Sequence, residues 1–470
     1  TRSSCKLLIM GQTISLAVTY CICHAGASLC QSCFGTTAPG TTGRKRSVLL
    51  LAIAIVMSLW FQYNVGPGIV SQTGWVWKIY RIIPGTGKWV YHAWYDGCLQ
   101  YKDQPQLLEQ CAGNAGVLRP TFLSALYFSA NAIATKIVPS LNKEAWPAKY
   151  ALYFFGILVT MFIGSSPFFT GFFLWIARLG AAAFIVLQQI ILIDVAYNWN
   201  DDWVDRANEA DRLSYGSGSG WLQGIVALCV FFYSAAIIGI GFLYATFDEC
   251  AGNNWVITLS WLAIVGMTIL QLSGYDGSLL TSSVISIYVV YLAYSIVSKN
   301  PSYECNPHLG QNDVWGMTIG LVLTSISMIW TGWSWSAEAR LSIDTLQAAK
   351  AINPTPSSHA MDNVNLDVPF LAAEEQPTTG LVTGSSQNME SPGLEHVWKL
   401  NVVMALISCY VAMILTNWGT VNGLDENHNA ANPTVGRINM AILGVSQWMT
   451  ILLYSWTLIA PRLFPDRDFS

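Results

Sequence analysis

Acidic and amide side chains recur on one face of an otherwise apolar stretch near the middle of the chain. Asp194, Asn198 and either Asp201 or Asp202 are spaced three to four residues apart, which places them on one side of a helix. Arg178 lies 16 residues earlier, about 24 Å along a helix axis, so it cannot pair with Asp194. Charges in lipid should face protein or a wet cavity. These groups therefore either line a site for a headgroup or small polar solute, or only hold neighbouring helices together.

No pattern for covalent chemistry accompanies these residues. The sequence contains no Walker A loop, no Gly-x-Gly-x-x-Gly turn, no His-Glu-x-x-His pair and no paired Cys-x-x-Cys. Its six histidines are scattered, and no basic patch is interleaved with aromatic residues as in nucleic-acid-binding proteins. We therefore expect no enzymatic activity, no cofactor, no bound metal and no nucleic-acid partner.

The element that must position these charges is a long helix over residues 171–199. Its 29 residues would form a rod of about 43 Å, against a hydrocarbon core of about 30 Å. The helix must then tilt strongly or extend past the membrane surface. Gly180, Gln188 and Gln189 supply small or polar positions that permit close contact with other helices.

The composition is that of an all-α polytopic membrane protein. Of 470 residues, 53% are hydrophobic and only 11% are charged, and the mean hydropathy is +0.42. Arg44, Lys45 and Arg46 precede the first apolar run and predict a cytosolic N-terminus. Ten spans, with both termini cytosolic, are predicted at 47–65, 117–138, 147–166, 171–199, 220–246, 255–273, 278–298, 314–336, 396–418 and 436–461. Such a protein belongs in the plasma membrane or in endomembranes.

The remaining segments divide the chain into four parts. Residues 1–46 are cysteine-rich and are interpreted as a signal peptide, as an acylated cytosolic segment or as an unmodified one. Residues 47–336 hold the first eight spans and an outer loop at 66–116, which is too polar to insert. Residues 337–395 are predicted to be a disordered cytosolic loop. Residues 396–470 hold the last two spans and a short tail. Interfacial anchors are predicted at Trp75, Trp77, Trp89 and Trp94.

Four cysteines fall in predicted outer loops, where disulfides persist: Cys98, Cys111, Cys250 and Cys305. Four cysteines allow three pairings. We favour Cys98–Cys111, which closes a short loop, and Cys250–Cys305, which ties two loops together. Cys229 and Cys409 lie within spans and should behave as small apolar side chains.

Several ordered segments resemble the serine incorporator family, also called TDE1/TMS membrane proteins. The matching segments are IILIDVAYNWNDDW at 190–203, SLLTSSVISIYVVYLAYSIVSKNP at 278–301 followed by Cys305-Asn306-Pro307, ILTNW at 414–418 and LLYSWTLIAPRLFPDRDFS at 452–470. The resemblance runs from about residue 117 to the end of the chain. The Trp-rich outer loop departs from the family pattern because it is unusually long.

The resemblance implies an architecture and a role. The family architecture is ten transmembrane helices in two bundles, crossed by one long inclined helix. The family is associated with serine supply for phosphatidylserine and sphingolipid synthesis, with movement of phospholipids between leaflets and, in animals, with antiviral restriction. On the long helix, the resemblance implies functional positions at Arg178, Asp194, Asn198, Trp199, Asn200 and Trp203.

The expected function is the handling of membrane lipids. Arg178 and Asp194 would stabilise headgroups in a groove beside the long helix, while acyl chains remain in the bilayer. The main alternative is a structural or accessory subunit of a larger membrane complex, with a homo-oligomer or another membrane protein as its partner. A serine-carrying subunit of lipid synthesis is a third hypothesis, for which the sequence offers no specific serine site.

Overall fold

A computed structural model describes most of the chain between residues 42 and 463. The described residues are 42–83, 85–138, 141, 146–273, 278–311, 313–331, 397–421, 430 and 432–463. Regular structure in these residues is helical, which confirms the predicted fold class. The predictions for the cysteine-rich segment before residue 42 and for the polar loop at 337–395 lie outside the described residues.

Eight helical stretches of the described chain are long and apolar enough to cross a membrane. They are Lys45–Val70, Ser165–Leu213, Ser219–Phe247, Ala251–Leu272, Leu279–Val297, Val314–Thr331, Val397–Leu415 and Pro433–Ala460. The two other predicted spans form α6 (Pro105–Ile137) and α7 (Trp146–Thr160). With 15 residues, α7 is shorter than the roughly 20 that a span needs, and the 33 residues of α6 include many polar and small side chains. The count of ten spans is therefore not established.

The segment predicted as a polar outer loop is helical. Pro105 starts α6 twelve residues before the predicted start at 117, since proline is well tolerated in a first helical turn. The residues before α6 form several short helices that pack against longer ones. These are α3 (Gly66–Val70), α4 (Gly74–Ile82), α5 (Thr86–Tyr95) and a 3₁₀ turn (Asp96–Tyr101).

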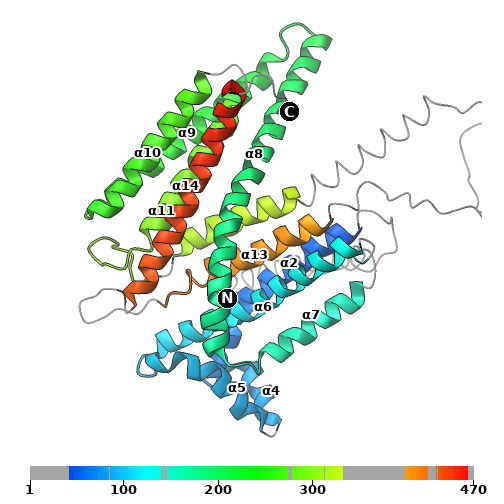
Figure 1. Ribbon diagram of the computed structural model, residues 1–470, viewed down its shortest axis with the longest axis vertical. Helices are drawn as coiled ribbons and strands as arrows, with labels where there is room; N and C mark the ends of the chain where they lie inside the picture. The colour runs from blue at the N-terminus through cyan, green and yellow to red at the C-terminus, as the bar shows by residue number, and fades with distance from the viewer. Residues whose placement is uncertain are drawn as a thin grey trace, which may run out of the picture.

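Helix α8 (Leu174–Leu213) lies between two groups of helices (Figure 1). One group contains α9 (Ser219–Phe247), α10 (Ala251–Leu272), α11 (Leu279–Val297) and α14 (Pro433–Leu463). The other contains α2 (Thr42–Trp60), α6, α7 and α13 (Val397–Leu415). Helix α8 packs against α13 of the second group and against α11 and α14 of the first, and it runs obliquely to α13 (Figure 1). This is the predicted arrangement of two bundles and a crossing helix.

Helix α8 is longer than the predicted segment 171–199. Its 40 residues span about 60 Å, and it continues to Leu213. An ion pair between Arg206 Nε and Asp202 Oδ2 at 3.0 Å connects successive turns of the extension. The helix ends before a glycine-rich turn, in which the Gly218 N–H donates to Asp211 Oδ1 at 2.7 Å. The extension is charged, so it leaves the hydrocarbon region.

Helix α8 approaches α13 closely at Gly180. A Cβ atom there would lie 2.8 Å from both Cβ and Sγ of Cys409, so only glycine permits this crossing. The sequence predicted Gly180 as a position of close helix contact, and the structure confirms it. Small residues at such crossings are how helices pack in lipid, where van der Waals contact replaces the hydrophobic driving force.

Both favoured disulfides are present. Cys98–Cys111 joins the 3₁₀ turn to α6, and Cys250–Cys305 joins the start of α10 to the segment after α11. Cys229 and Cys409 are buried free thiols, as predicted. Residues close to both bonds line one cavity, so the two disulfides lie at the same end of the molecule, here called the disulfide end.

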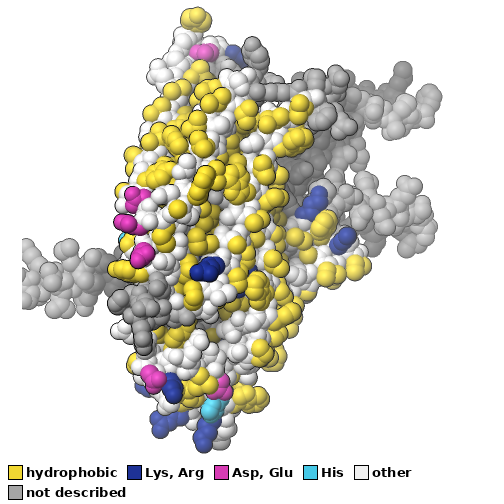
Figure 2. Space-filling model, turned by 60° about the vertical axis from the view of Figure 1, so that its left-hand side comes forward, with side chains coloured by type: hydrophobic (Ala, Val, Ile, Leu, Met, Phe, Trp, Pro, Cys, Tyr) yellow, Lys and Arg dark blue, Asp and Glu magenta, His cyan; other side chains and the backbone are white. Residues whose placement is uncertain are grey.

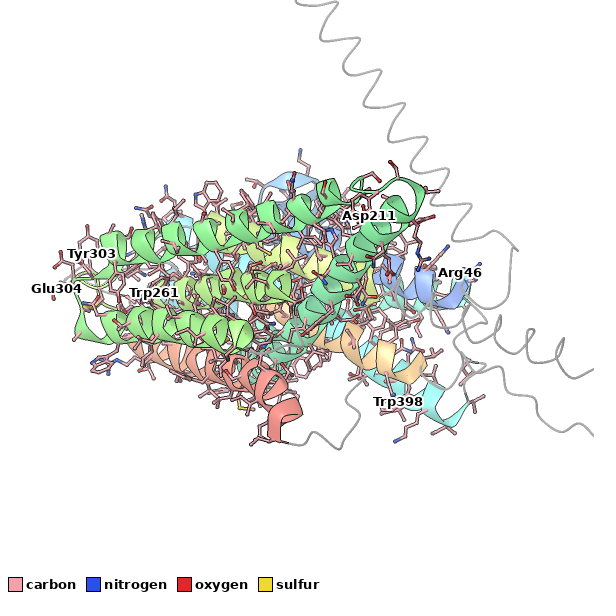
Figure 3. All side chains as sticks on the ribbon, turned by 90° about the horizontal axis from the view of Figure 1, so that it is seen from above. Arg46, Asp211, Trp261, Tyr303, Glu304 and Trp398 are labelled. Atoms are coloured by element: carbon pink, nitrogen blue, oxygen red, sulfur yellow. A yellow bond between two sulfur atoms is a disulfide. The ribbon has the colours of Figure 1, made fainter. Side chains whose placement is uncertain are left out.

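Polar and apolar surfaces are arranged as a bilayer requires. Tyr303 and Glu304 lie at the disulfide end, whereas Arg46, Asp211 and Trp398 lie at the opposite end (Figure 3). Hydrophobic side chains are spread over the face between the ends in Figure 2, with a Lys or Arg side chain near its centre and acidic side chains along one edge. The fold therefore presents an apolar flank between two polar ends.

Candidate functional site

Arg178 is a buried cation with an incomplete set of partners. Its side chain is 3% exposed, and Nη2 donates to the Trp418 carbonyl at 3.3 Å. The guanidinium carbon lies 5.1 Å from the centre of the Trp175 ring. Nε is buried without a hydrogen-bond partner, and no carboxylate of the described residues pairs with this side chain. A buried guanidinium with unused donors favours a bound anion.

The carbonyl that meets Arg178 belongs to a left-handed turn. Asn417, Trp418 and Gly419 have φ values of 49°, 61° and 74°. Such a conformation costs of order 1–3 kcal/mol for each non-glycine residue and persists only where the surroundings impose it. Asn439 of α14 contributes by donating Nδ2 to the same Trp418 carbonyl at 3.0 Å. The turn thereby fixes an acceptor between α8 and α14.

Arg178 lines a cavity of about 390 Å³ at the disulfide end, here called the polar cavity because its wall is more polar than that of the groove beside it. The cavity lies where α6, α8, the segment after α11, the end of α13 and the start of α14 converge. Polar lining residues include Asn114, Lys299, Thr416 and Asn417. Asn114 Nδ2 donates to the Thr420 carbonyl at 2.9 Å, which joins α6 to the turn. The volume of the cavity lies in the range of small-molecule sites.

The second cation of the cavity, Lys299, is neutralised. Its Nζ lies 2.9 Å from Asp313 Oδ2, while the Tyr294 hydroxyl donates to Asp313 Oδ1 at 2.8 Å. Burial raises the pKa of Asp313, but the Lys299 charge and the hydrogen bonds from Lys299, Tyr294 and the Gly316 N–H outweigh it and hold the pKa below its usual value. Among the described lining residues, Arg178 is thus the cation without a counter-charge.

An apolar groove of about 750 Å³ adjoins the polar cavity. Its walls come from α9, α11 and the helix Val314–Thr331, including Phe242, Val290 and Ile319. The two spaces share four lining residues: Ser298, Leu309, Gly310 and Asn417. A polar compartment next to an apolar one matches an amphiphile with a charged head and a hydrocarbon tail.

Asp194 lies on an exposed side of α8, on the half of the helix away from the cavity. Its Oδ2 accepts from Trp330 Nε1 at 2.6 Å, and its Oδ1 accepts from Asn198 Nδ2 at 3.0 Å. The partner that the carboxylate finds on another membrane-spanning helix is thus an indole and not a cation. Asp194 and Asn198 do share a helix face, as their spacing indicated.

The remaining predicted residues point elsewhere. The Trp199 ring packs edge-on against Trp203 at 5.9 Å and against Phe232 of α9 at 6.4 Å. Asn200 donates Nδ2 to its neighbour Asp201 at 3.3 Å. At 100° per residue, positions 198, 199 and 200 face three directions. The predicted positions therefore form three polar locations, at Arg178, at Asp194 with Asn198 and at Asn200, and one aromatic cluster.

Sequence reasoning missed Lys299, Asn417 and Trp330 as neighbours of the predicted charges. Lys299 and Asn417 lie in two segments that carry the family resemblance, and this was the available signal. The positions of residues 178, 299 and 417 in the sequence do not indicate that they line the same cavity. The interpretation of Trp94 as an interfacial anchor is wrong, because it is fully buried and stacks on the Arg119 guanidinium at 3.7 Å.

Comparison with known proteins identifies the family. A model of the family "Serine incorporator (Serinc)" matches residues 19–467. Serine incorporator 2 of Mus musculus is 24% identical, over 98% of this chain and 99% of the relative. A probable serine incorporator of Nematostella vectensis is 28% identical over 69% and 72%, and membrane protein TMS1 of Saccharomyces cerevisiae is 24% identical over 70% and 74%. The chain, with its long crossing helix and two groups of helices, therefore belongs to the serine incorporator family.

Proposed function

We propose that this protein binds phospholipids and moves them between leaflets. The headgroup occupies the polar cavity beside Arg178, and an acyl chain occupies the adjoining groove between α9, α11 and Val314–Thr331. No covalent step is required, because the protein only replaces the water that a headgroup loses on leaving the membrane surface.

The observation that carries this proposal is the unpaired, buried guanidinium of Arg178. It is 3% exposed and retains an unpartnered Nε in a cavity of about 390 Å³. Arginine binds phosphate and carboxylate groups with charge-assisted hydrogen bonds. The relatives are named serine incorporators, and a phosphoserine headgroup offers both of these anions. Phosphatidylserine is therefore the proposed preferred lipid.

Asp194 supplies a second polar location for the same movement. It lies about 24 Å along α8 from Arg178 and faces the exposed side, with Trp330 and Asn198 beside it. The ammonium group of a headgroup is the chemical complement of this carboxylate. A lipid passing along α8 would meet a cation near one membrane surface and an anion near the other.

The test is lipid movement in proteoliposomes that carry fluorescent phosphatidylserine, read by chemical quenching of the outer leaflet. Arg178→Gln should slow the movement by about tenfold or more, because one charge-assisted contact is worth about 1.5–3 kcal/mol. Arg178→Lys should retain part of the rate. Arg206→Gln is the matched control, since it removes a charge from the exposed end of the same helix.

An unchanged rate in Arg178→Gln, with intact thermal stability, would refute the role of the cavity. An equal loss in Arg206→Gln would mean that overall charge, not the cavity, governs the rate. If no variant and no parent moves lipid, and a second membrane protein co-purifies in fixed ratio, the accessory-subunit hypothesis replaces this proposal.

A further inference from the structure

The short helices α4 and α5 form a hairpin that the proposed lipid path does not use. They lie at the lower end of the molecule in Figure 1. The Thr86 hydroxyl donates to the Tyr80 carbonyl at 3.0 Å, and the Trp77 and Tyr91 rings pack 6.0 Å apart. The hairpin is therefore a defined element with a fixed outer surface.

Helix α4 presents three sectors around its axis. Val76, Trp77 and Tyr80 are half-buried and face the protein. At 100° per residue, Lys78 and Arg81 occupy a second sector, and Ile79 and Ile82 a third, adjacent one. Both of these sectors are exposed, and Ile82 is 79% exposed. A cationic stripe beside an apolar stripe is the pattern of a helix lying in a membrane interface.

Helix α5 continues the same surface. Lys88 is exposed next to Trp89, which is 63% exposed. No acidic residue occurs anywhere in residues 66–95, so the cations of the hairpin have no local counter-charge within that stretch of sequence. Figure 2 shows Lys and Arg side chains gathered with apolar ones at this lower end of the molecule, with acidic and His side chains beside them.

The hairpin begins just after Lys45–Val70, a helical stretch long and apolar enough to cross a membrane, and it packs beside the end of α7. Tyr80 and Trp89 pack edge-on against Phe162, at 5.9 and 5.7 Å, just beyond the end of α7 at Thr160. One and two turns before Phe162, Leu158 and Phe155 of α7 are 57% and 64% exposed, as is typical of side chains that face acyl chains. The exposed surface of α4 and α5 therefore lies beside the headgroup layer.

From this geometry we propose that the α4–α5 hairpin is an interfacial anchor that binds anionic phospholipid headgroups. Ile79, Ile82 and Trp89 insert among the upper acyl carbons, and Lys78, Arg81 and Lys88 contact headgroup phosphates. The occupant is the lipid surface and not a second copy of this chain, because a copy would bring cations against cations. This anchor is separate from the Arg178 cavity and does not depend on lipid movement.

Hydrogen exchange of the full-length protein in nanodiscs tests the anchor. Peptides from residues 74–95 are compared in phosphatidylcholine discs and in discs with about one-third phosphatidylglycerol. Each cation near an anionic surface strengthens binding by roughly fivefold, so exchange in the parent should slow by about tenfold or more in the anionic discs. The variant Lys78→Gln/Arg81→Gln/Lys88→Gln should lose this difference.

The matched control is Lys45→Gln/Arg212→Gln/Lys136→Gln, which removes the same charge from exposed side chains of α2, α8 and α6 near the opposite end. It should keep the full effect of phosphatidylglycerol at residues 74–95. Equal exchange of the parent in both kinds of disc would overturn the proposal, whatever the variants do. Protection that appears in lipid-free micelles and disappears in discs holding one copy would instead identify a self-association surface, and would also overturn it.

Discussion

At the scale of single residues, two buried arginines differ in how many of their N–H donors have a hydrogen-bond partner. Arg119 is fully buried, and its nitrogens donate to the carbonyls of Ala93, Ala115, Thr160 and Ile163 and to the Ser165 hydroxyl. Arg178 reaches one carbonyl and keeps an unpartnered Nε. A guanidinium carries five N–H donors, so Arg119 uses its capacity to hold the fold together while Arg178 keeps capacity for a ligand.

Substitution of the two arginines should therefore separate stability from function. Arg119→Met leaves several buried carbonyls without a donor and should lower the free energy of unfolding by about 3 kcal/mol or more. Arg178→Gln should change it by less than about 1 kcal/mol, because few bonds are lost and a desolvated charge is removed. Thermal unfolding in detergent, followed by fluorescence, measures both. The reverse ranking would contradict these assignments.

The ion pair of Lys299 and Asp313 should give the protein an acid-sensitive component of stability. The folded pKa of Asp313 lies below its unfolded value of about 3.9, so the stabilisation is complete above about pH 5 and is lost as the pH falls through the lowered folded pKa. Asp313→Asn leaves the buried charge of Lys299 unpaired and should lower the free energy of unfolding by about 3 kcal/mol at pH 7.

Melting temperatures of the parent and Asp313→Asn, recorded between pH 7 and pH 2.5, test this pair. The gap between the two proteins should be constant above pH 5 and should narrow below pH 4. A gap that widens on acidification would mean that the pKa of Asp313 is raised, not lowered, in the folded protein.

Residue-level prediction from the sequence succeeded for local spacing and for the two disulfides, whose cysteines fall in predicted outer loops, but not for the partners of the charges on α8. The spacing of Asp194 and Asn198 placed them on one face, and the structure agrees. The partners of those charges come from far along the chain: Trp330 is 136 residues from Asp194, and Trp418 is 240 from Arg178. Helix periodicity carries no information about such contacts, because they are determined by how the two groups of helices pack.

At the scale of elements, close crossings determine where helices can meet. Gly180 permits α8 to touch α13, and Gly113 of α6 comes equally close to the backbone near Gln62, where an added Cβ would lie 2.5 Å from the carbonyl oxygen. At these two contacts the helices are so close that there is no room for a side chain. The contact at Gly113 lies where α6 packs against residues Phe61–Val65, the π-helical continuation of α2.

Gly180→Ala should be destabilising although alanine favours helices. The new Cβ would meet Cys409 at 2.8 Å, and separating α8 from α13 should cost about 1–3 kcal/mol. Gly241→Ala in α9 is the control: nothing lies within 4 Å of its Cβ position, so the protein should become slightly more stable. Thermal unfolding of the two variants decides between a packing effect and a propensity effect. Equal changes in melting temperature for the two variants would show that Gly180 is not needed for the contact between α8 and α13.

Long, strongly apolar elements were predictable, and short amphipathic ones were not. Helices α9, α10 and α11 lie within about five residues of the expected spans at each end. The hairpin of α4 and α5 was interpreted as part of a polar loop, because cations such as Lys78, Arg81 and Lys88 interrupt the short apolar runs of the two helices. Its short helices are stabilised by packing against Phe162. This residue lies too far along the chain to fall within a hydropathy window that covers the hairpin.

At the scale of the whole molecule, α8 makes chemically different contacts with its two sides. Toward α13 the contact is apolar, with Gly180 against Cys409 and Phe184 against Tyr410. Toward α11 and α14 it is hydrogen-bonded. The Tyr288 hydroxyl donates to the Ile185 carbonyl at 2.9 Å, and Gln189 Nε2 donates to the Thr450 carbonyl at 2.8 Å. The two interfaces can therefore be weakened separately.

Gln189→Leu combined with Tyr288→Phe should loosen the group of α9, α10, α11 and α14 from α8. Interhelical hydrogen bonds in membranes contribute about 0.6 kcal/mol on average and up to about 1.7 kcal/mol each, so the loss of two should raise backbone exchange in α11 and α14 by about eightfold or more. Peptides from α13 should be unaffected. Hydrogen exchange with mass spectrometry measures both groups in one experiment. A uniform rise across α11, α13 and α14 would show that the two interfaces are not independent.

The continuity of α8 restricts the motions that can open the space beside Arg178. A rod of about 60 Å that contacts both groups of helices has no loop at the crossing that could bend, and breaking its backbone hydrogen bonds in lipid would be costly. We therefore expect the two halves of the protein to roll and slide by small steps over the sides of α8, as packed helices do in shear motions. Spin labels on α11 and α13 would then report a change in relative rotation with little change in their separation along the rod.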